Sequence, residues 1–121
     1  MTIATMNPEW EIIELSGSLN VSNAIEFQRQ LTKGILSEQH PALLVDMQQV
    51  ESIDSAGLIA LVSAFRLAQQ RKQRLSLCSI APSIRIVFEL TQLDQAFEIF
   101  DNRETFATTI KPYEQEARLI A

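Results

Sequence analysis

The sequence predicts one α/β domain, built on a small, mixed and mostly parallel sheet with covering helices. Its 121 residues are enough for one hydrophobic core and too few for two ordinary domains. Short apolar segments alternate with longer segments whose apolar residues recur every three or four positions. A composition of 46% hydrophobic and 21% charged residues is typical of folded globular proteins. The predicted order is β-β-α-β-α-β-α-β-α, and the alternation of strands with helices favours parallel strands.

The first two elements are predicted to be short strands over residues 2–6 and 10–16. Asn7-Pro8-Glu9 separates them, because asparagine and proline are strong turn formers. The segment 10–15 is rich in β-forming residues, and apolar side chains occupy both of its alternating sets. We therefore expect the second strand to be partly buried on both sides and to end at Ser16-Gly17-Ser18.

A helix is predicted to follow, with Ser22 or Asn23 as its N-cap and Glu26 in its first turn. The residues expected to face the sheet are Ala24, Phe27, Leu31 and Ile35. Pro41 ends this helix, because proline disfavours helical backbone in the residue before it. We interpret His40 as a solvated loop residue, since no Cys, Asp or second His accompanies it at metal-ligand spacing.

The central part of the sequence combines a buried strand with a polar connection. Residues 42–45 form an apolar strand that we expect at the centre of the sheet, with Asp46 at its C-terminal end. A polar loop over 48–52 is predicted to lead to a helix that begins at Asp54 or Ser55. Binding groups collect in loops that leave the C-terminal ends of parallel strands. The apolar positions of the helix are Leu58, Leu61, Val62, Phe65 and Ala68, widened by Ile59, Ala60 and Ala64.

The last third of the sequence repeats the alternation. Strands are predicted over 75–80 and 97–100, with a helix between them that starts at Ala81-Pro82-Ser83. Its inward face should consist of Ile84, Val87, Phe88 and Thr91. A final short helix should run to about residue 110, with Asp101 or Asn102 as its N-cap. Pro112 should break it, which leaves 113–121 as a loose tail or a short amphipathic extension.

Composition narrows the class of function. The net charge is −5, and apart from Arg71-Lys72-Gln73-Arg74 the basic residues are scattered, which does not favour a nucleic-acid surface. Cys78 is the one cysteine and lies in an apolar strand, so we expect a buried, reduced thiol. The sequence shows no secretion signal and no apolar stretch long enough to span a membrane. We expect a cytoplasmic protein without membrane insertion.

Catalytic chemistry is poorly supported by these residues. The sequence has one His, and it contains no Gly-rich phosphate cradle and no Cys-x-x-Cys or paired-His spacing. Ser55 has no plausible general base except His40, which is predicted on a different loop. We predict a non-enzymatic protein without metal or cofactor. The Ser55 hydroxyl lies at a predicted helix N-terminus, where unpaired N–H groups and the helix dipole suit negative charge.

The segment Asp54-Ser-Ala-Gly-Leu58, with the strand before it and the apolar helix after it, resembles the STAS domains of bacterial anti-sigma factor antagonists. Two later segments, 84–93 and 97–100, support the resemblance, which covers about residues 10–108. It implies a STAS domain over 1–110 and a tail or short extension over 111–121. It also implies that Ser55 is phosphorylated by the anti-sigma factor, a serine kinase that uses ATP, and dephosphorylated by a metal-dependent serine phosphatase. The unphosphorylated antagonist would bind the anti-sigma factor and so release a sigma factor.

The partner-binding residues implied by the resemblance are Asn20, Asp54, Ser55, Ala56, Gly57 and Leu58. Asn20 and Ala56 depart from the residues that many relatives carry, which are Asp and Ser or Thr. The residues alone leave other roles open: Ser55 or Asp54 as a helix cap, Gly57 as a packing residue, and Asn20 as a turn or cap residue. Asp-Ser/Thr-Ala-Gly also occurs in STAS subunits of bacterial lipid-transport complexes. The alternative function is therefore a non-enzymatic subunit bound to a transporter ATPase. The oligomeric state stays open.

Overall fold

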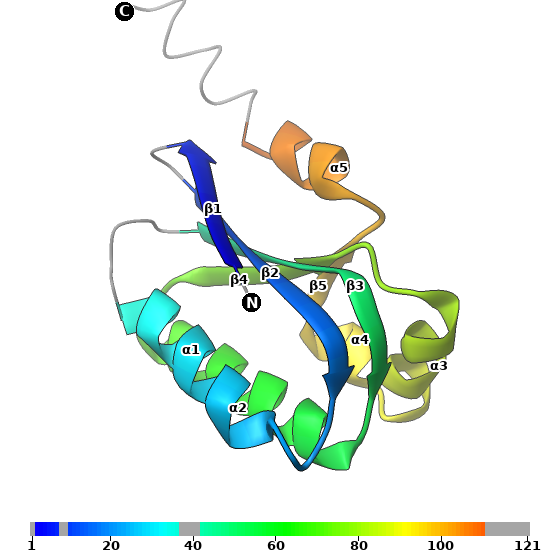
Figure 1. Ribbon diagram of the computed structural model, residues 1–121. Helices are drawn as coiled ribbons and strands as arrows, with labels where there is room; N and C mark the ends of the chain where they lie inside the picture. The colour runs from blue at the N-terminus through cyan, green and yellow to red at the C-terminus, as the bar shows by residue number, and fades with distance from the viewer. Residues whose placement is uncertain (1, 8–9, 37–41, 111–121) are drawn as a thin grey trace, which may run out of the picture.

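The strands form one sheet in the order β1-β2-β3-β4-β5 (Figure 1). This computed structural model describes residues 2–7, 10–36 and 42–110. The strand bounds are β1 Thr2–Asn7, β2 Trp10–Leu19, β3 Ala42–Ile53, β4 Arg74–Cys78 and β5 Glu98–Phe100. β1 pairs antiparallel with β2, and every other neighbouring pair is parallel. The predicted single α/β domain with a mixed, mostly parallel sheet is confirmed.

The helices cover both faces of the sheet unequally. Their bounds are α1 Ala24–Leu36, α2 Ser55–Gln70, α3 Pro82–Leu90, α4 Leu93–Ala96 and α5 Arg103–Thr108. α1 and α2 lie side by side on one face of the sheet (Figure 1), whereas α5 packs on the opposite face through Phe106. α4 is absent from the predicted order because four residues are too few to show a helical period.

Alternation along the strands produces two apolar cores. Ile13 and Val45 belong to the larger core, which the sheet forms with α1, α2 and α3. Ile12 and Leu44 point to the opposite face, where Phe106 of α5 covers them. The expectation that β2 is buried on both sides is confirmed, because Ile12 and Ile13 are both buried.

β2 and β3 are longer than predicted, and this changes the shape of the site. Their parallel pairing continues through Ser16 with Gln49 and Leu19 with Ile53, past two register shifts near Gly17, whose φ is +78°. The predicted end of β2 at residues 16–18 and the predicted loop over 48–52 are therefore wrong. Polar residues form a strand here because the backbone of β2 satisfies their N–H and C=O groups, whatever their side chains are. Asp46 consequently lies within β3, and Asp54 alone connects β3 to α2.

The predicted helix faces are largely correct. Ala24, Phe27, Leu31 and Ile35 are all buried. Ile59 was expected to widen the buried stripe of α2, but 65% of it is exposed. Leu58 and Leu61 face the core, and Ile59 projects about 100° around the helix from Leu58 and farther still from Leu61. His40 and residues 111–121 lie outside the described residues.

A partly buried ion pair joins α5 to the sheet. Asp46 is 4% exposed, and its Oδ2 accepts a hydrogen bond from Arg103 Nε at 2.6 Å. Its Oδ1 accepts from the Gln48 backbone N–H at 2.9 Å. The hydrogen bond to Asp46 raises the pKa of Arg103, and Glu14 at 3.4 Å adds to this effect. Asp46 is therefore a structural residue of this face, and the structure does not bring it to the start of α2.

Candidate functional site

Asp54 begins helix α2 as its N-cap. Its backbone is extended, with φ −106° and ψ −174°, and its Oδ1 accepts a hydrogen bond from the Gly57 N–H at 3.0 Å. The first helical bond runs from the Leu58 N–H to the Asp54 carbonyl at 2.9 Å. Of the capping roles that the sequence left open, the structure assigns the cap to Asp54. Ser55 is then the first residue of α2, and both residues are exposed.

The same carboxylate binds a second segment of the chain. Asp54 Oδ2 accepts a hydrogen bond from the Val21 N–H at 3.2 Å, and the Asp54 N–H donates to the Leu19 carbonyl at 3.0 Å. These bonds join the turn between β2 and α1 to the start of α2, across 33 positions of sequence. This contact could not be predicted from side chains, because the donor at position 21 is a backbone N–H that any residue except proline carries.

Gly57 permits the close approach of these two segments. A Cβ at this position would lie 2.6 Å from the Leu19 carbonyl oxygen and 2.8 Å from Cγ1 of Ile53. Gly57 and Leu58 are both buried, so they support the site from beneath. Among the residues proposed for partner binding, Asp54 and Ser55 are exposed, and Asn20 and Ala56 are partly exposed.

Asn20 organises the turn that precedes α1. Its Oδ1 accepts from the Ser22 N–H at 2.9 Å, and its own N–H donates to Oδ1 of Asn23 at 2.9 Å. The Asn20 carbonyl accepts from the Ala24 N–H at 2.8 Å. These reciprocal bonds resemble a capping box, with Asn20 at its first position and Asn23 at its fourth, directly before α1. A second bond from Asn23, Nδ2 to the Ser18 carbonyl at 2.7 Å, fixes the turn to the end of β2.

Exposed apolar side chains occur in the turn before α1, on α1 and on α2. Val21 lies in the turn before α1 and Ile25 in the first turn of α1, and each is 75% exposed. Ile59 is also exposed and lies four residues after Ser55 on α2. We call Val21, Ile25 and Ile59 the apolar rim. Sequence reasoning missed the rim, although positions 21 and 25 could have been noticed because they fall outside the inward stripe of α1.

The Ser55 hydroxyl is free to react. Within the described part of the chain it has no hydrogen-bond partner. A phosphate attached there would lie at the first position of a 16-residue helix, where the dipole and the unpaired N–H groups favour negative charge.

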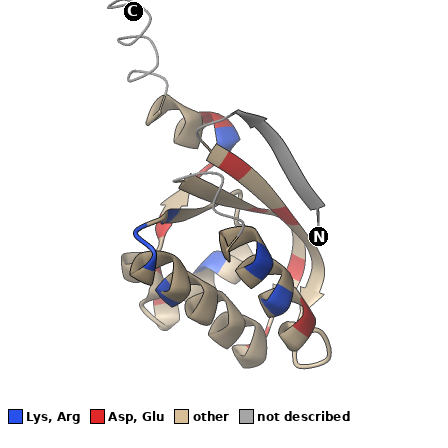
Figure 2. Cartoon of the chain, turned by 90° about the vertical axis from the view of Figure 1, so that its left-hand side faces the viewer, with Lys and Arg blue, Asp and Glu red and all other residues tan. Residues whose placement is uncertain are grey.

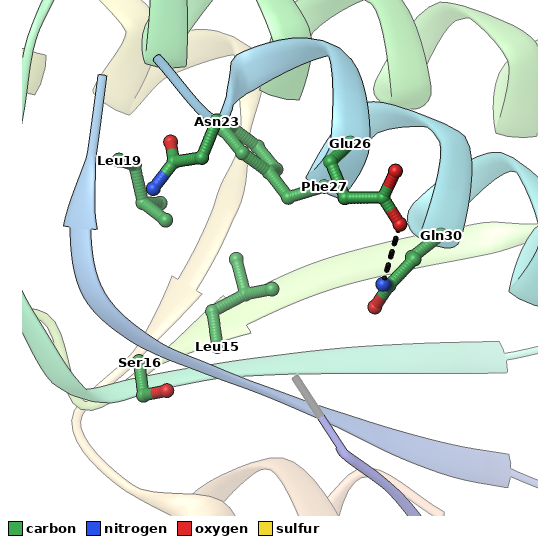
Figure 3. Close-up of a pocket in the computed structure, with 7 residues that line it drawn as sticks. All are labelled: Leu15, Ser16, Leu19, Asn23, Glu26, Phe27 and Gln30. Atoms are coloured by element: carbon green, nitrogen blue, oxygen red, sulfur yellow. Dashed lines mark hydrogen bonds between the residues drawn. The ribbon is translucent and has the colours of Figure 1, made fainter. Parts of the chain in front are cut away.

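A shallow hollow lies beside the turn, between β2 and α1 (Figure 3). Leu15, Leu19 and Phe27 contribute its apolar part, and its volume is about 150 Å³. Its polar lining consists of Ser16, Asn23, Glu26 and Gln30. Pockets for drug-sized ligands and cofactors measure roughly 300–1,000 Å³, so this hollow is too small for a nucleotide.

Charge is dispersed over the face that carries α1 and α2. α1 carries Glu26, Arg29 and Lys33, and α2 carries Arg66; in Figure 2 these coloured segments are separated by uncharged stretches of helix. Among residues 10–36 and 42–110, no cluster of three or more His, Cys, Asp or Glu side chains could hold a metal ion. None of the described helices is both long and apolar enough to cross a membrane.

Comparison with known protein families assigns this chain to a family. Residues 3–106 match the STAS domain, and they include every strand residue except Thr2 of β1, together with the first four residues of α5. The chain belongs to the STAS domain family. The STAS fold predicted from Asp54-Ser-Ala-Gly-Leu58 is thus confirmed.

Two curated STAS relatives carry related names. The anti-sigma F factor antagonist of Paenibacillus polymyxa is 21% identical over 100 residues, which cover 83% of this chain and 86% of that protein. A Bordetella bronchiseptica protein, BtrV, provisionally named as an anti-sigma factor antagonist, is 28% identical over 97 residues, covering 80% of this chain and 83% of that protein.

Solved STAS structures share the fold of this chain. The anti-sigma factor antagonist SpoIIAA of Bacillus, in its unphosphorylated form, superposes with a TM-score of 0.68 at 17% identity, covering 92% of this chain and 96% of that one. An antagonist from Mycobacterium paratuberculosis gives a TM-score of 0.77 at 20% identity, covering 91% and 95%. SpoIIAA has also been solved in its phosphorylated form, with a TM-score of 0.68 at 17% identity, covering 89% and 97%. Identities this low establish the fold alone.

Proposed function

We propose that this STAS domain is an anti-sigma factor antagonist, a non-enzymatic binding module switched by phosphorylation of Ser55. The observation that carries the proposal is the exposed Ser55 hydroxyl at the first position of α2, which has no hydrogen-bond partner among the described residues and follows Asp54, the residue bonded to the turn. The names of the two curated relatives support the same role. The partner of the unphosphorylated form is an anti-sigma factor serine kinase, and its capture releases a sigma factor. A metal-dependent serine phosphatase regenerates this form.

The physics of such a switch follows from the surroundings of Ser55. Phosphorylation adds about −1.5 to −2 charges, which the start of α2 tolerates within the free domain. In the complex the same group would be pressed against a partner, next to the Asp54 carboxylate and among the exposed apolar side chains of the rim. A penalty of about 3–4 kcal/mol would weaken binding by roughly two to three decades. A loss of affinity of that size is enough to convert a mostly bound antagonist into a mostly free one.

The alternative, a STAS subunit bound to a transporter ATPase, is less well supported. Both curated relatives are named for the anti-sigma system and not for transport. In the proposed arrangement the domain spans residues 1–110 and acts in the cytoplasm, with 111–121 as a tail. Asn20, Asp54, Ser55 and Ala56 lie at or near the partner surface, whereas Gly57 and Leu58 shape it from beneath.

Intact-mass measurement tests the proposal. The protein is incubated with ATP and each candidate anti-sigma kinase, and we expect the addition of one phosphate that Ser55→Ala abolishes. Ser83→Ala is the matched control, because Ser83 is also an exposed serine in the first turn of a helix. A phosphate that persists in Ser55→Ala, or stable binding to a transporter ATPase without modification by any kinase, would exclude this function.

Substitution of Ser55 by Asp tests the charge mechanism separately. Ser55→Asp places a carboxylate at the start of α2, where the dipole favours it, so the free energy of unfolding should change by less than about 0.5 kcal/mol. Binding of the kinase should weaken by about tenfold or more, because one charge replaces nearly two. Calorimetric titration of the complex measures this, and unchanged affinity would place the interface elsewhere.

A further inference from the structure

We infer that Asp54 is a positioning residue, which holds the turn between β2 and α1 at a fixed place beside Ser55. The inference rests on the proposed function, since the surface so assembled is the one that the kinase meets. Asp54 acts through the turn, by bonds within the domain, and not by touching the partner or the reacting hydroxyl.

The two carboxylate oxygens of Asp54 are divided between two segments of the chain. Oδ1 accepts from the Gly57 N–H at 3.0 Å in its own helix, and Oδ2 accepts from the Val21 N–H at 3.2 Å in the turn. The Asp54 N–H adds a third bond, to the Leu19 carbonyl at 3.0 Å. A capping role requires one oxygen, so the second bond indicates a further task.

The turn is internally rigid but needs an external anchor. The bonds among Asn20, Ser22 and Asn23 fix its own shape and join it to Ser18. The end of β2 is in turn held to the start of α2, because Leu19 pairs with Ile53 and its carbonyl accepts from the Asp54 N–H. The bond to Val21 is the side-chain bond that extends this link to the turn itself, and it thereby restrains Val21 and Ile25, two of the three residues of the apolar rim, relative to Ser55.

This geometry predicts which kinetic constant depends on Asp54. A turn that moves relative to Ser55 must be ordered when the kinase binds, so the KM for Ser55 phosphorylation rises while kcat is preserved. A residue that acted on the hydroxyl itself would lower kcat instead.

Two substitutions separate the anchor from the cap. Asp54→Ser keeps a good N-cap, yet its single short oxygen cannot also serve Val21. Asp54→Asn keeps the size of the side chain, but an amide has only one accepting oxygen. The N–H of either Gly57 or Val21 would then face the amide NH₂, which is itself a donor. Asn102→Ser is the matched control, because Asn102 caps α5 through the Thr105 N–H at 2.8 Å and anchors no second segment.

The experiment combines amide hydrogen exchange with steady-state phosphorylation of the full chain by its kinase. Both Asp54 variants should speed exchange at Val21 by about tenfold, the effect expected for one charge-assisted hydrogen bond. They should raise KM by a similar factor with kcat unchanged, while Asn102→Ser changes neither. Unchanged exchange at Val21 would overturn the inference, and so would a fall in kcat without a rise in KM. Lost kinase binding with normal exchange at Val21 would also overturn it, because it would mean that Asp54 contacts the kinase directly. If no kinase modifies the wild type, the proposed function fails, and exchange at Val21 still decides whether Asp54 anchors the turn.

Discussion

Replacing Gly57 by Ala tests whether the close approach of α2 to β2 is a requirement of the fold. The new Cβ would lie 2.6 Å from the Leu19 carbonyl oxygen, and this oxygen cannot move without breaking its bond to the Asp54 N–H. Overpacking of this kind costs about 1–3 kcal/mol. The gain in helix propensity, at most about 1 kcal/mol, is smaller in a first turn. We expect a net loss of about 1–2 kcal/mol in the free energy of unfolding.

Gly34→Ala is the matched control within the same chain. Its Cβ would meet Cδ1 of Ile13 at 3.2 Å, which is the flexible end of a side chain and can move by a few tenths of an ångström. The propensity gain then dominates, and stability should rise by up to about 1 kcal/mol. Urea unfolding of both variants should give midpoints that differ by about 1 M. If Gly57→Ala proves as stable as Gly34→Ala, the contact with Leu19 does not limit the site.

Three further predictions concern the rest of the domain. Arg103→Ala should lower the free energy of unfolding by about 2–3 kcal/mol, because it leaves the Asp46 carboxylate buried without its counter-ion, and Asp46→Asn in the same chain should restore part of the loss in urea titrations. Hydrogen bonds from Arg74 are the main cause that lowers the pKa of Glu98, so its contribution to folding stability is present above pH 4.5 and is lost as the pH falls further. Because nearly half of the side chain is exposed, Glu98→Gln should flatten the loss of stability in acid by only about 0.5 kcal/mol. A loss of stability as steep as in the wild type would contradict this. Burial raises the pKa of Cys78 from 9.0 to about 11, so the contribution of the neutral thiol to folding stability is complete below pH 9 and is lost between pH 9 and 11. A thiol reagent at pH 8 should therefore label the native protein about 100-fold more slowly than the urea-unfolded protein. Comparable labelling rates would show that the thiol is accessible.

Local chemistry explains why much of the site was predictable. Asp54 is a strong N-cap residue and an apolar helix follows it, so the start of α2 was placed correctly at Asp54 or Ser55. The inward faces of α1 and of most of α2 follow from a 3.6-residue period. The bonds of the turn before α1 were not predictable in detail, because Asn20, Ser22 and Asn23 are all good cap residues and their pairing depends on where β2 ends.

The sequence by itself determined the α/β class, the elements except α4, most inward-facing residues of the helices (Ile59 and Thr91 are exposed) and the position of Ser55, because each depends on residues close together in the chain. Tertiary structure decided the lengths of β2 and β3, which depend on strand pairing, and the burial of Asp46, which depends on Arg103 more than fifty residues away. It also decided that Asp54 binds the backbone of Val21. Backbone groups are the same at every position, so no pattern of side chains announces such a bond before the chain is folded.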